Sequence, residues 1–240
     1  MPFFCQALYI KDYFVIRVLF GVLMTLWLVF FSCFSTAGII IGGTRIIYSS
    51  DKSDATISVR NNDNTLPYLI QTWVDPFESR DRSSPPFTVI PPVSRLEPQQ
   101  EKILRIMKVK GALPDDRESV FWLNVKNIPP SGNSPNRLEI AIKTRIKLFW
   151  RPAALKVTPE AAAPKVTWHT EGGFLVVHNP SAIHINVMNV TVDGKDVPLN
   201  IIRPFETLRL PLPAGTSGHN MVWRYVNDYG GISNTIALTL

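Results

Sequence analysis

Cysteine is nearly absent from the sequence, and the two that occur, Cys5 and Cys33, both lie near the amino terminus. No disulfide can therefore cross-link the rest of the chain, which must be held together by ordinary hydrophobic cores; a segment of about 200 residues can supply them. Glycine is also sparse beside proline, with 13 residues against 20. This balance favours many short strands joined by rigid turns.

The residues that usually build an active site are few and dispersed. None of the four histidines has Cys, Asp or Glu partners at metal-ligand spacing, so each is expected to be satisfied by hydrogen bonds or to face solvent. No glycine-rich phosphate loop occurs, and "GTSGH" at Gly215 to His219 lacks the final glycine of a nucleophile elbow. We therefore expect no metal, no cofactor, no small-molecule substrate and no enzymatic activity. The histidines are His169, His178, His184 and His219.

The basic excess of the chain also does not suggest nucleic-acid binding. The formal net charge is +6, but the basic residues are dispersed, and no interleaved aromatic and basic motif of the RNA-binding kind occurs. The sequence gives no reason to expect a nucleic-acid partner. It also contains no internal repeat of fixed period and no low-complexity tract.

The first 37 residues differ in kind from the rest. Lys11 and Arg17 precede an uncharged apolar run from Val18 to Phe31, and "STA" follows at Ser35 to Ala37. A basic region, an apolar region and a small-x-small site are typical of a secretory signal peptide. We expect cleavage near Ala37. The uncharged run is also long enough for a retained membrane helix, which stays as the alternative.

Short apolar alternations of the β type follow one another from residue 38 to 154, with no helical periodicity. Residues 155–164, "LKVTPEAAAP", have two prolines and an alanine run, which is typical of an interdomain linker. Further strand patterns occupy residues 165–240. The sequence therefore predicts an all-β protein with two immunoglobulin-like β-sandwich domains.

One predicted strand is unusually long. In "LEIAIKTRIKLFW", Leu138 to Trp150, one face is apolar and the other carries the basic residues Lys143, Arg145 and Lys147. Most strands have five or six residues. On the residues alone, the apolar face would be expected to pack into this protein's own core, and a lysine on an edge strand would be a solvated guard against aggregation.

Six motifs occur in order across nearly all of the chain after the leader: "GTRIIY" (43–48), "LPYLIQTWV" (66–74), "PPVSRLEP" (91–98), "DRESVFWLNVKNIPP" (116–130), "LEIAIKTRIKLFWRPAAL" (138–155) and "NDYGG" (227–231). Together they resemble the periplasmic chaperones of the chaperone/usher pilus pathway. The resemblance implies two immunoglobulin-like domains set in an L, with a cleft between them. It also implies a non-enzymatic assembly chaperone whose last strand of the first domain completes the fold of a pilus subunit.

The same resemblance assigns roles to particular residues. By motif, Arg45 and Lys147 correspond to a pair that anchors the C-terminal carboxylate of the subunit. Leu138, Ile140 and Ile142 would fill the groove that an incomplete subunit leaves open. These assignments give the long strand a purpose, because its apolar residues would enter the partner while its lysine would fix the register.

Two further groups carry over from the family. One is a charged network near the cleft that ties the two domains together: Glu118, Arg151 and Asp228. The other resembles a contact surface for the outer-membrane usher, although its members could equally be ordinary turn and strand residues: Pro91, Pro92 and Arg105.

The resemblance implies pilus subunits and an outer-membrane usher as partners, in the periplasm. An exposed apolar strand edge also predicts some self-association or self-capping when no subunit is bound. A surface or adhesive immunoglobulin-like protein remains the alternative, although it would give no reason for pairing Arg45 with Lys147. A secreted β-sandwich enzyme would need a metal or nucleophile constellation that the sequence does not offer.

Overall fold

The computed structural model describes residues 17, 19–21, 23–24, 38–78, 84–109, 111–131 and 138–240. It divides into two compact units, Met1–Ala37 and Gly38–Leu240. The expected cleavage point at Ala37 lies outside the described residues. Within the described part of the chain, no helix has the length and apolar character needed to cross a membrane.

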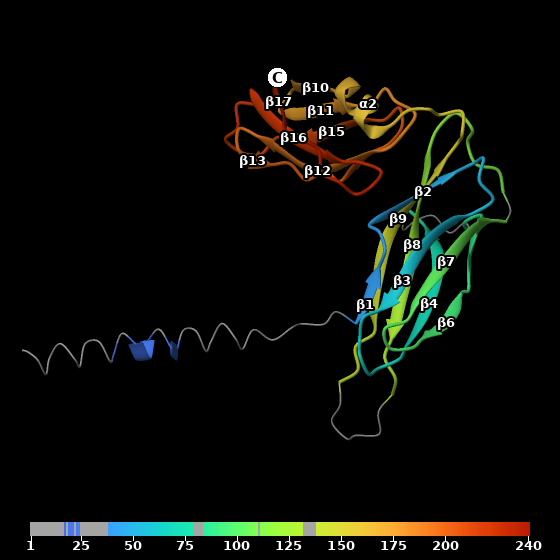
Figure 1. Ribbon diagram of the computed structural model, residues 1–240. Coiled ribbons are helices and arrows are strands. Elements are labelled where there is room, and N and C mark those ends of the chain that lie inside the picture. The colour runs from blue at the N-terminus through green and yellow to red at the C-terminus, as the bar shows by residue number, and fades with distance from the viewer. Residues whose placement is uncertain are drawn as a thin grey trace, which may run out of the picture. The chain divides into compact units, whose positions relative to one another are not determined.

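Two β-sheets form the N-terminal domain (Figure 1). Their strands pair antiparallel, except that β2 pairs in parallel with β9. One sheet has the order β1-β3-β7-β5 and the other β2-β9-β8-β4-β6. Their facing sides bury a single apolar cluster that includes Val59, Leu104, Ile106, Leu123 and Leu148. The strands are β1 (Ile39–Ile41), β2 (Arg45–Ser49), β3 (Ala55–Asn61), β4 (Tyr68–Pro76), β5 (Phe87–Ile90), β6 (Val93–Leu96), β7 (Glu101–Lys108), β8 (Ser119–Ile128) and β9 (Ile142–Arg151).

The first strand of this domain changes sheets. Strand β1 pairs with β3 in one sheet, and β2 pairs in parallel with β9 in the other. The chain crosses between them just after Gly42, where an added Cβ would lie 2.3 Å from Ser58 Oγ. The missing side chain therefore permits the crossing, and the crossing places β2 beside the second half of β9.

Strand β9 is shorter at its start than the alternation predicted. It begins at Ile142, whereas Leu138 to Ala141 form no strand. The pairing with β8 ends where Ile142 lies opposite Asn127, and β8 itself ends one residue later, before Pro129. Proline has no N–H for a ladder hydrogen bond, so the residues before Ile142 have no strand on which to continue. The strand is still ten residues long.

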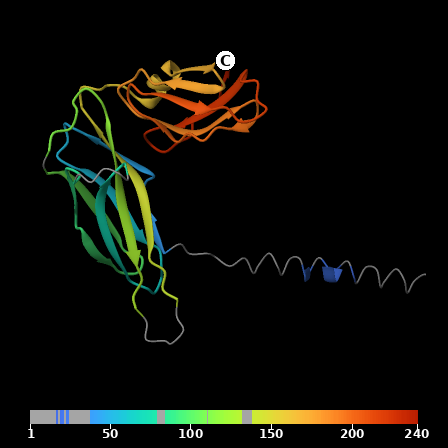
Figure 2. The same ribbon diagram turned by 180° about the vertical axis from the view of Figure 1, so that it is seen from behind.

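A second sandwich forms the C-terminal domain, seen from behind in Figure 2. One sheet has the order β10-β11-β15 and the other β13-β12-β16-β17, with β14 beside β12. Their buried cluster is distinct from that of the first domain and includes Leu175, Ile185 and Trp223. The strands are β10 (Thr167–Glu171), β11 (Phe174–His178), β12 (Ile185–Val192), β13 (Lys195–Asp196), β14 (Ile201–Ile202), β15 (Thr207–Pro211), β16 (Asn220–Val226) and β17 (Ile236–Thr239).

The segment expected to be a linker contains the short helix α2 (Pro159–Ala162) and the 3-10 turn η1 (Ala163–Lys165). Alanine favours helix, and proline is tolerated at the first helical position, so Pro159 and the alanine run suit this turn. Ala162 and Ala163 are fully buried in the C-terminal cluster. The end of the segment therefore packs with the second domain. The two-sandwich, all-β prediction is confirmed.

Candidate functional site

The parallel pairing of β2 with β9 sets Arg45 directly opposite Lys147. Residues opposite each other in a sheet have side chains on the same face, so the two cations stand side by side. Their neighbours Ile46 and Leu148 point into the core, with exposed fractions of 6% and 0%. The alternation of each strand therefore presents both cations on the outer face of the sheet.

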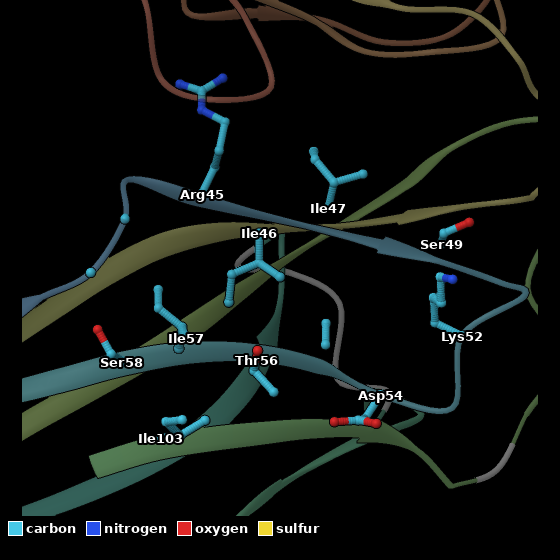
Figure 3. Close-up of a pocket in the computed structure, with 13 residues that line it drawn as sticks. Arg45, Ile46, Ile47, Ser49, Lys52, Asp54, Thr56, Ile57, Ser58 and Ile103 are labelled. Carbon is cyan, nitrogen blue, oxygen red and sulfur yellow. The ribbon is translucent and has the colours of Figure 1, made fainter. Parts of the chain in front are cut away.

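Figure 3 shows the direction in which the Arg45 side chain extends from β2. Arg45 and Ile47 stand on one side of β2, whereas Ile46 points toward β3 and its Ile57. A groove of about 620 Å³ lies between β2 and β3, and the base of Arg45 contributes to its lining. The Arg45 guanidinium points away from β3. Lys147, which is in register with Arg45, lies on the same face of the sheet.

Both cations contact neutral acceptors of the C-terminal domain. Lys147 Nζ donates to Asn186 Oδ1 at 2.8 Å, and Arg45 donates through a terminal nitrogen to the Val226 carbonyl at 3.4 Å. Asn186 and Val226 are themselves directly opposite each other in the β12–β16 ladder. The pair Asn186 and Val226 of the C-terminal domain therefore faces the pair Arg45 and Lys147 of the N-terminal domain. Both acceptors are neutral, so they do not neutralise the two positive charges.

The positive charges perturb each other at this position. Burial and the neighbouring Arg45 charge lower the pKa of Lys147 to about 8. Burial also lowers the pKa of Arg45, and the charge of Asp228 opposes that change. Arg45 Nε is buried and has no hydrogen-bond partner within the described part of the chain. The pair is thus an electropositive point, which suits an anionic oxygen.

The outward residues of the second half of β9 each meet one partner in the C-terminal domain. Lys147 contacts Asn186, as above, and the next outward residue, Phe149, lies 5.6 Å from the His184 ring between ring centres. Phe149 is only 1% exposed, although the alternation placed it on the polar face. The second domain covers this part of the face, which explains an aromatic residue there.

Arg151, the third outward residue, is the centre of the predicted charged network. Its Nε donates to Glu118 Oε1 at 2.8 Å, and its two terminal nitrogens donate to the Asp228 carboxylate at 2.6 and 2.8 Å. The other Glu118 oxygen accepts the His184 backbone N–H at 2.8 Å and lies 2.9 Å from His184 Nδ1. Burial alone would lower the pKa of Arg151, but Asp228 and Glu118 outweigh it and raise that pKa.

A tight loop of the C-terminal domain holds Asp228 in place. Asn227 Oδ1 accepts the backbone N–H groups of Tyr229 and Gly231, at 3.1 and 2.7 Å. Gly230 has φ of 86°, and a Cβ there would lie 2.5 Å from the hydroxyl of Thr44, the residue before Arg45. The "NDYGG" motif therefore has a structural cause, since glycine allows both the backbone conformation and the close approach.

Leu138, Ile140 and Ile142, predicted to fill a groove in a partner, are all exposed in this chain. Their exposed fractions are 83%, 63% and 57%. They do not join the buried cluster of the N-terminal domain. The interpretation in which they pack into this protein's own core is therefore wrong: Leu138 and Ile140 precede β9, and Ile142 is its first residue, at the end of the pairing with β8.

The first half of β9 also has one open edge. Strand β2 begins opposite Lys147, so within the part of the chain that the structure describes residues 142–146 pair with β8 alone. Ile142 directs its N–H toward β8, to Asn127 Oδ1, whereas the Arg151 carbonyl accepts from Ser50 beyond β2. Backbone groups alternate in direction along a strand. Lys143 and Arg145 therefore point theirs to the open edge.

The residues predicted as an usher contact surface lie close together. Ile90, next to Pro91, is directly opposite Arg105 in the β5–β7 ladder. The carbonyls of Pro91 and Pro92 accept hydrogen bonds from Thr72, and Arg105 pairs with Asp54 at 3.1 Å. Pro92 and Arg105 are exposed.

His184 and Asn186 were not singled out from the sequence as members of a site. Both are buried polar residues, with exposed fractions of 4% and 6%, and they alternate with Ile183, Ile185 and Val187 of the core. Buried polar side chains on the outer parity of a strand imply that another element covers them. That pattern is the signal that could have identified them. Among the described residues, no group of three or more His, Cys, Asp or Glu could hold a metal ion.

Two family models match the chain, one for each sandwich. Residues 38–156 match the N-terminal domain of PapD, described as a pili and flagellar-assembly chaperone. Residues 161–237 match the C-terminal domain of the pili assembly chaperone PapD. Among curated proteins, chaperone protein FocC of Escherichia coli is 32% identical over 91% of this chain and 97% of FocC. Chaperone protein caf1M of Yersinia pestis is 36% identical over 81% of this chain and 83% of caf1M.

Solved structures agree. A chain of the Salmonella enterica complex of SafA pilin with the SafB chaperone is 37% identical, with a TM-score of 0.75 over 87% of this chain and 99% of that chain. The Escherichia coli chaperone DraB is also 37% identical, with a TM-score of 0.75 over 85% of this chain and 99% of its own. This chain belongs to the family of PapD-like pilus assembly chaperones.

Proposed function

We propose that the protein binds pilus subunits in the periplasm and supplies the strand that such a subunit lacks. The observation that carries this proposal is the first half of β9, where an open backbone edge and three exposed apolar side chains occur together. The resemblance to the SafB chaperone, solved with a pilin, supports the same partner class. Burial of each apolar side chain would contribute about 1.5 to 3 kcal/mol before ordering costs.

In this proposal, Leu138, Ile140 and Ile142 enter the groove of the subunit, and the subunit's C-terminal carboxylate binds between Arg45 and Lys147. A carboxylate only accepts hydrogen bonds, and the two cations offer donors. Charge-assisted hydrogen bonds contribute about 1.5 to 3 kcal/mol each. The anchor would fix the register, because a slip by one residue would turn the apolar residues out of the groove.

The remaining predicted residues have supporting roles in the same proposal. Glu118, Arg151 and Asp228, together with His184, would keep the two domains in one orientation, so that Asn186 and Val226 stay beside the cations. Pro91, Pro92 and Arg105 would contact an outer-membrane usher that receives the loaded subunit. The leader, cleaved near Ala37, would direct export to the periplasm. Without a subunit, the exposed apolar segment would favour self-association.

Co-export with candidate pilus subunits tests the proposal. Wild type, Arg45→Ala and Lys147→Ala would be compared for recovery of a soluble one-to-one complex, with Lys165→Ala as a control for an exposed lysine of the C-terminal domain. We expect wild type and the control to yield the complex and both anchor variants to lose it while their melting temperatures stay close to wild type. Equal recovery by all four proteins would contradict the anchor.

A further inference from the structure

The outer face of the first half of β9 is strongly basic. Lys143, Arg145 and Lys147 occupy alternate positions on β9, and Lys126 of β8 lies directly opposite Lys143. Because residues in register share a face, these four side chains form one surface with Arg45, which lies beside Lys147. We call Arg45, Lys126, Lys143, Arg145 and Lys147 the basic face.

Two tryptophans support the cations of the basic face. Lys143 Nζ lies 5.6 Å from the centre of the Trp73 ring, and the Arg145 guanidinium lies 5.5 Å from that of Trp122. Arg145 Nε also donates to the buried Asn124 side chain at 3.1 Å. Cation–π contacts favour defined side-chain positions, so Lys143 and Arg145 are held along the strand although both are exposed.

The charge of this face is poorly compensated within the protein. In the described part of the chain, the basic face forms one salt bridge, from Arg145 to Asp75 at 3.4 Å. Lys126 and Lys143, like charges, are directly opposite each other across the ladder. Such a pair is destabilising in a free sheet. An acidic partner strand would relieve that cost, which is a reason to expect one.

The position of the basic face defines which part of a subunit would meet it. A subunit strand on the open edge of β9, with its carboxylate at Arg45 and Lys147, must run toward Lys147 and therefore parallel to β9. It would end where β2 begins. Every second side chain of that strand would share the outer face with Lys143 and Arg145.

We propose that the basic face selects subunits whose last strand carries acidic side chains at alternating outward positions before its C-terminal carboxylate. This inference rests on the proposed function, since it concerns the same strand. The apolar side chains of Leu138, Ile140 and Ile142 would recognise the subunit's groove, and the basic face would recognise the outer side of its final strand. Complementary charge at an interface contributes specificity and faster association.

Synthetic peptides separate this inference from the anchor. Three ten-residue peptides would alternate valine with glutamate, glutamine or lysine, each made with a free C-terminal carboxylate and with an amide. Binding to the purified protein would be measured by calorimetry at low salt. We expect the glutamate peptide to bind about tenfold more tightly than the glutamine peptide, as two or three cross-strand charge pairs would give. The ratio should shrink at high salt.

Charge reversal in the protein completes the test. Lys143→Glu with Arg145→Glu should reverse the preference toward the lysine peptide, whereas Lys165→Glu with Lys195→Glu, two exposed lysines of the C-terminal domain, should leave it unchanged. Equal binding of the glutamate and glutamine peptides, or no measurable binding of any peptide, would overturn the inference. If amidation weakens both peptides while their affinities remain equal, the anchor stands and only the acidic preference fails. If amidation changes nothing, the anchor is wrong.

Discussion

The two halves of strand β9 differ in their pairing and in the burial of their side chains. From Lys147 to Arg151 the strand has neighbours on both edges, and the inward residues Ile146, Leu148 and Trp150 are buried. Among the described residues, Ile142 to Ile146 pair with β8 alone, and every side chain from Ile142 to Arg145 is exposed. The second half therefore carries the stability of the strand. The first half extends from that rigid base as an unfinished sheet edge, in the geometry that addition of a partner strand requires.

The largest expected effect concerns Arg151, at the end of the second half of β9. Arg151→Ala removes the cation between Glu118 and Asp228, and breaking a buried ion pair from one side costs about 3 to 5 kcal/mol. Urea unfolding measured by tryptophan fluorescence would report the loss. Arg117→Ala removes an exposed cation that pairs with Asp116 at 2.7 Å, and should change the free energy of unfolding by less than about 1 kcal/mol. Equal effects of the two substitutions would contradict the structural role of the network.

A matched pair of apolar truncations sharpens the comparison directly. Leu148→Ala deletes a fully buried side chain and should lower the free energy of unfolding by about 2 to 5 kcal/mol. Ile142→Ala, in a side chain that is 57% exposed, should lower it by less than about 1 kcal/mol and yet reduce capture of a subunit. If Ile142→Ala proved as destabilising as Leu148→Ala, the two halves would not differ as described.

Gly230→Ala tests how the loop that presents Asp228 depends on glycine. The substitution forces a non-glycine residue to φ of 86° and brings a Cβ to 2.5 Å from Thr44 Oγ1. Such strain costs about 1 to 3 kcal/mol. Gly194→Ala is a matched control, since Gly194 has φ of 79° but no atom within 4 Å of the added Cβ. Thermal unfolding should therefore separate the contact with Thr44 from the backbone strain that both variants share.

The smallest effect is a pH dependence with opposite signs for binding and stability. Because Lys147 has a pKa of about 8, its charge is lost as pH rises through 8, and affinity for a carboxylate should fall about tenfold from pH 7 to pH 9. Between pH 8 and 10.5, the usual pKa of lysine, Lys147 is protonated in the unfolded chain but mostly neutral in the folded protein. The unfolded state therefore binds more protons than the folded state, so the contribution of Lys147 to stability rises with pH. Lys147→Arg should keep its affinity over the same range.

Much of the fold could be predicted from alternation alone. Ile146, Leu148 and Trp150 are buried, as the alternation of residues 138–150 indicated, because a two-residue period depends only on neighbours along the chain. The start of β9 could not be predicted in this way. Leu138 continues the alternation, but a strand also needs a partner, and β8 ends before it reaches that residue.

The charged residues of the candidate site could be selected from the sequence, but their neutral partner Asn186 could not. Motif resemblance selected Arg45, Lys147 and Arg151, whose roles depend on charge type. The contact between Lys147 and Asn186 joins residues of two domains, so no local period indicates it. Likewise, the register that sets Arg45 opposite Lys147 depends on where the first strand changes sheets, after Gly42.

Amide hydrogen exchange on β9, measured for the free protein and for its complex with a pilus subunit, tests the central claim most directly. Lys143 and Arg145 direct their backbone N–H groups to the open edge, whereas Trp150 lies where β9 has neighbours on both edges. Strand donation predicts that the amides of Lys143 and Arg145 become strongly protected on binding while that of Trp150 changes little. Unchanged exchange at Lys143 and Arg145 in an intact complex would contradict it.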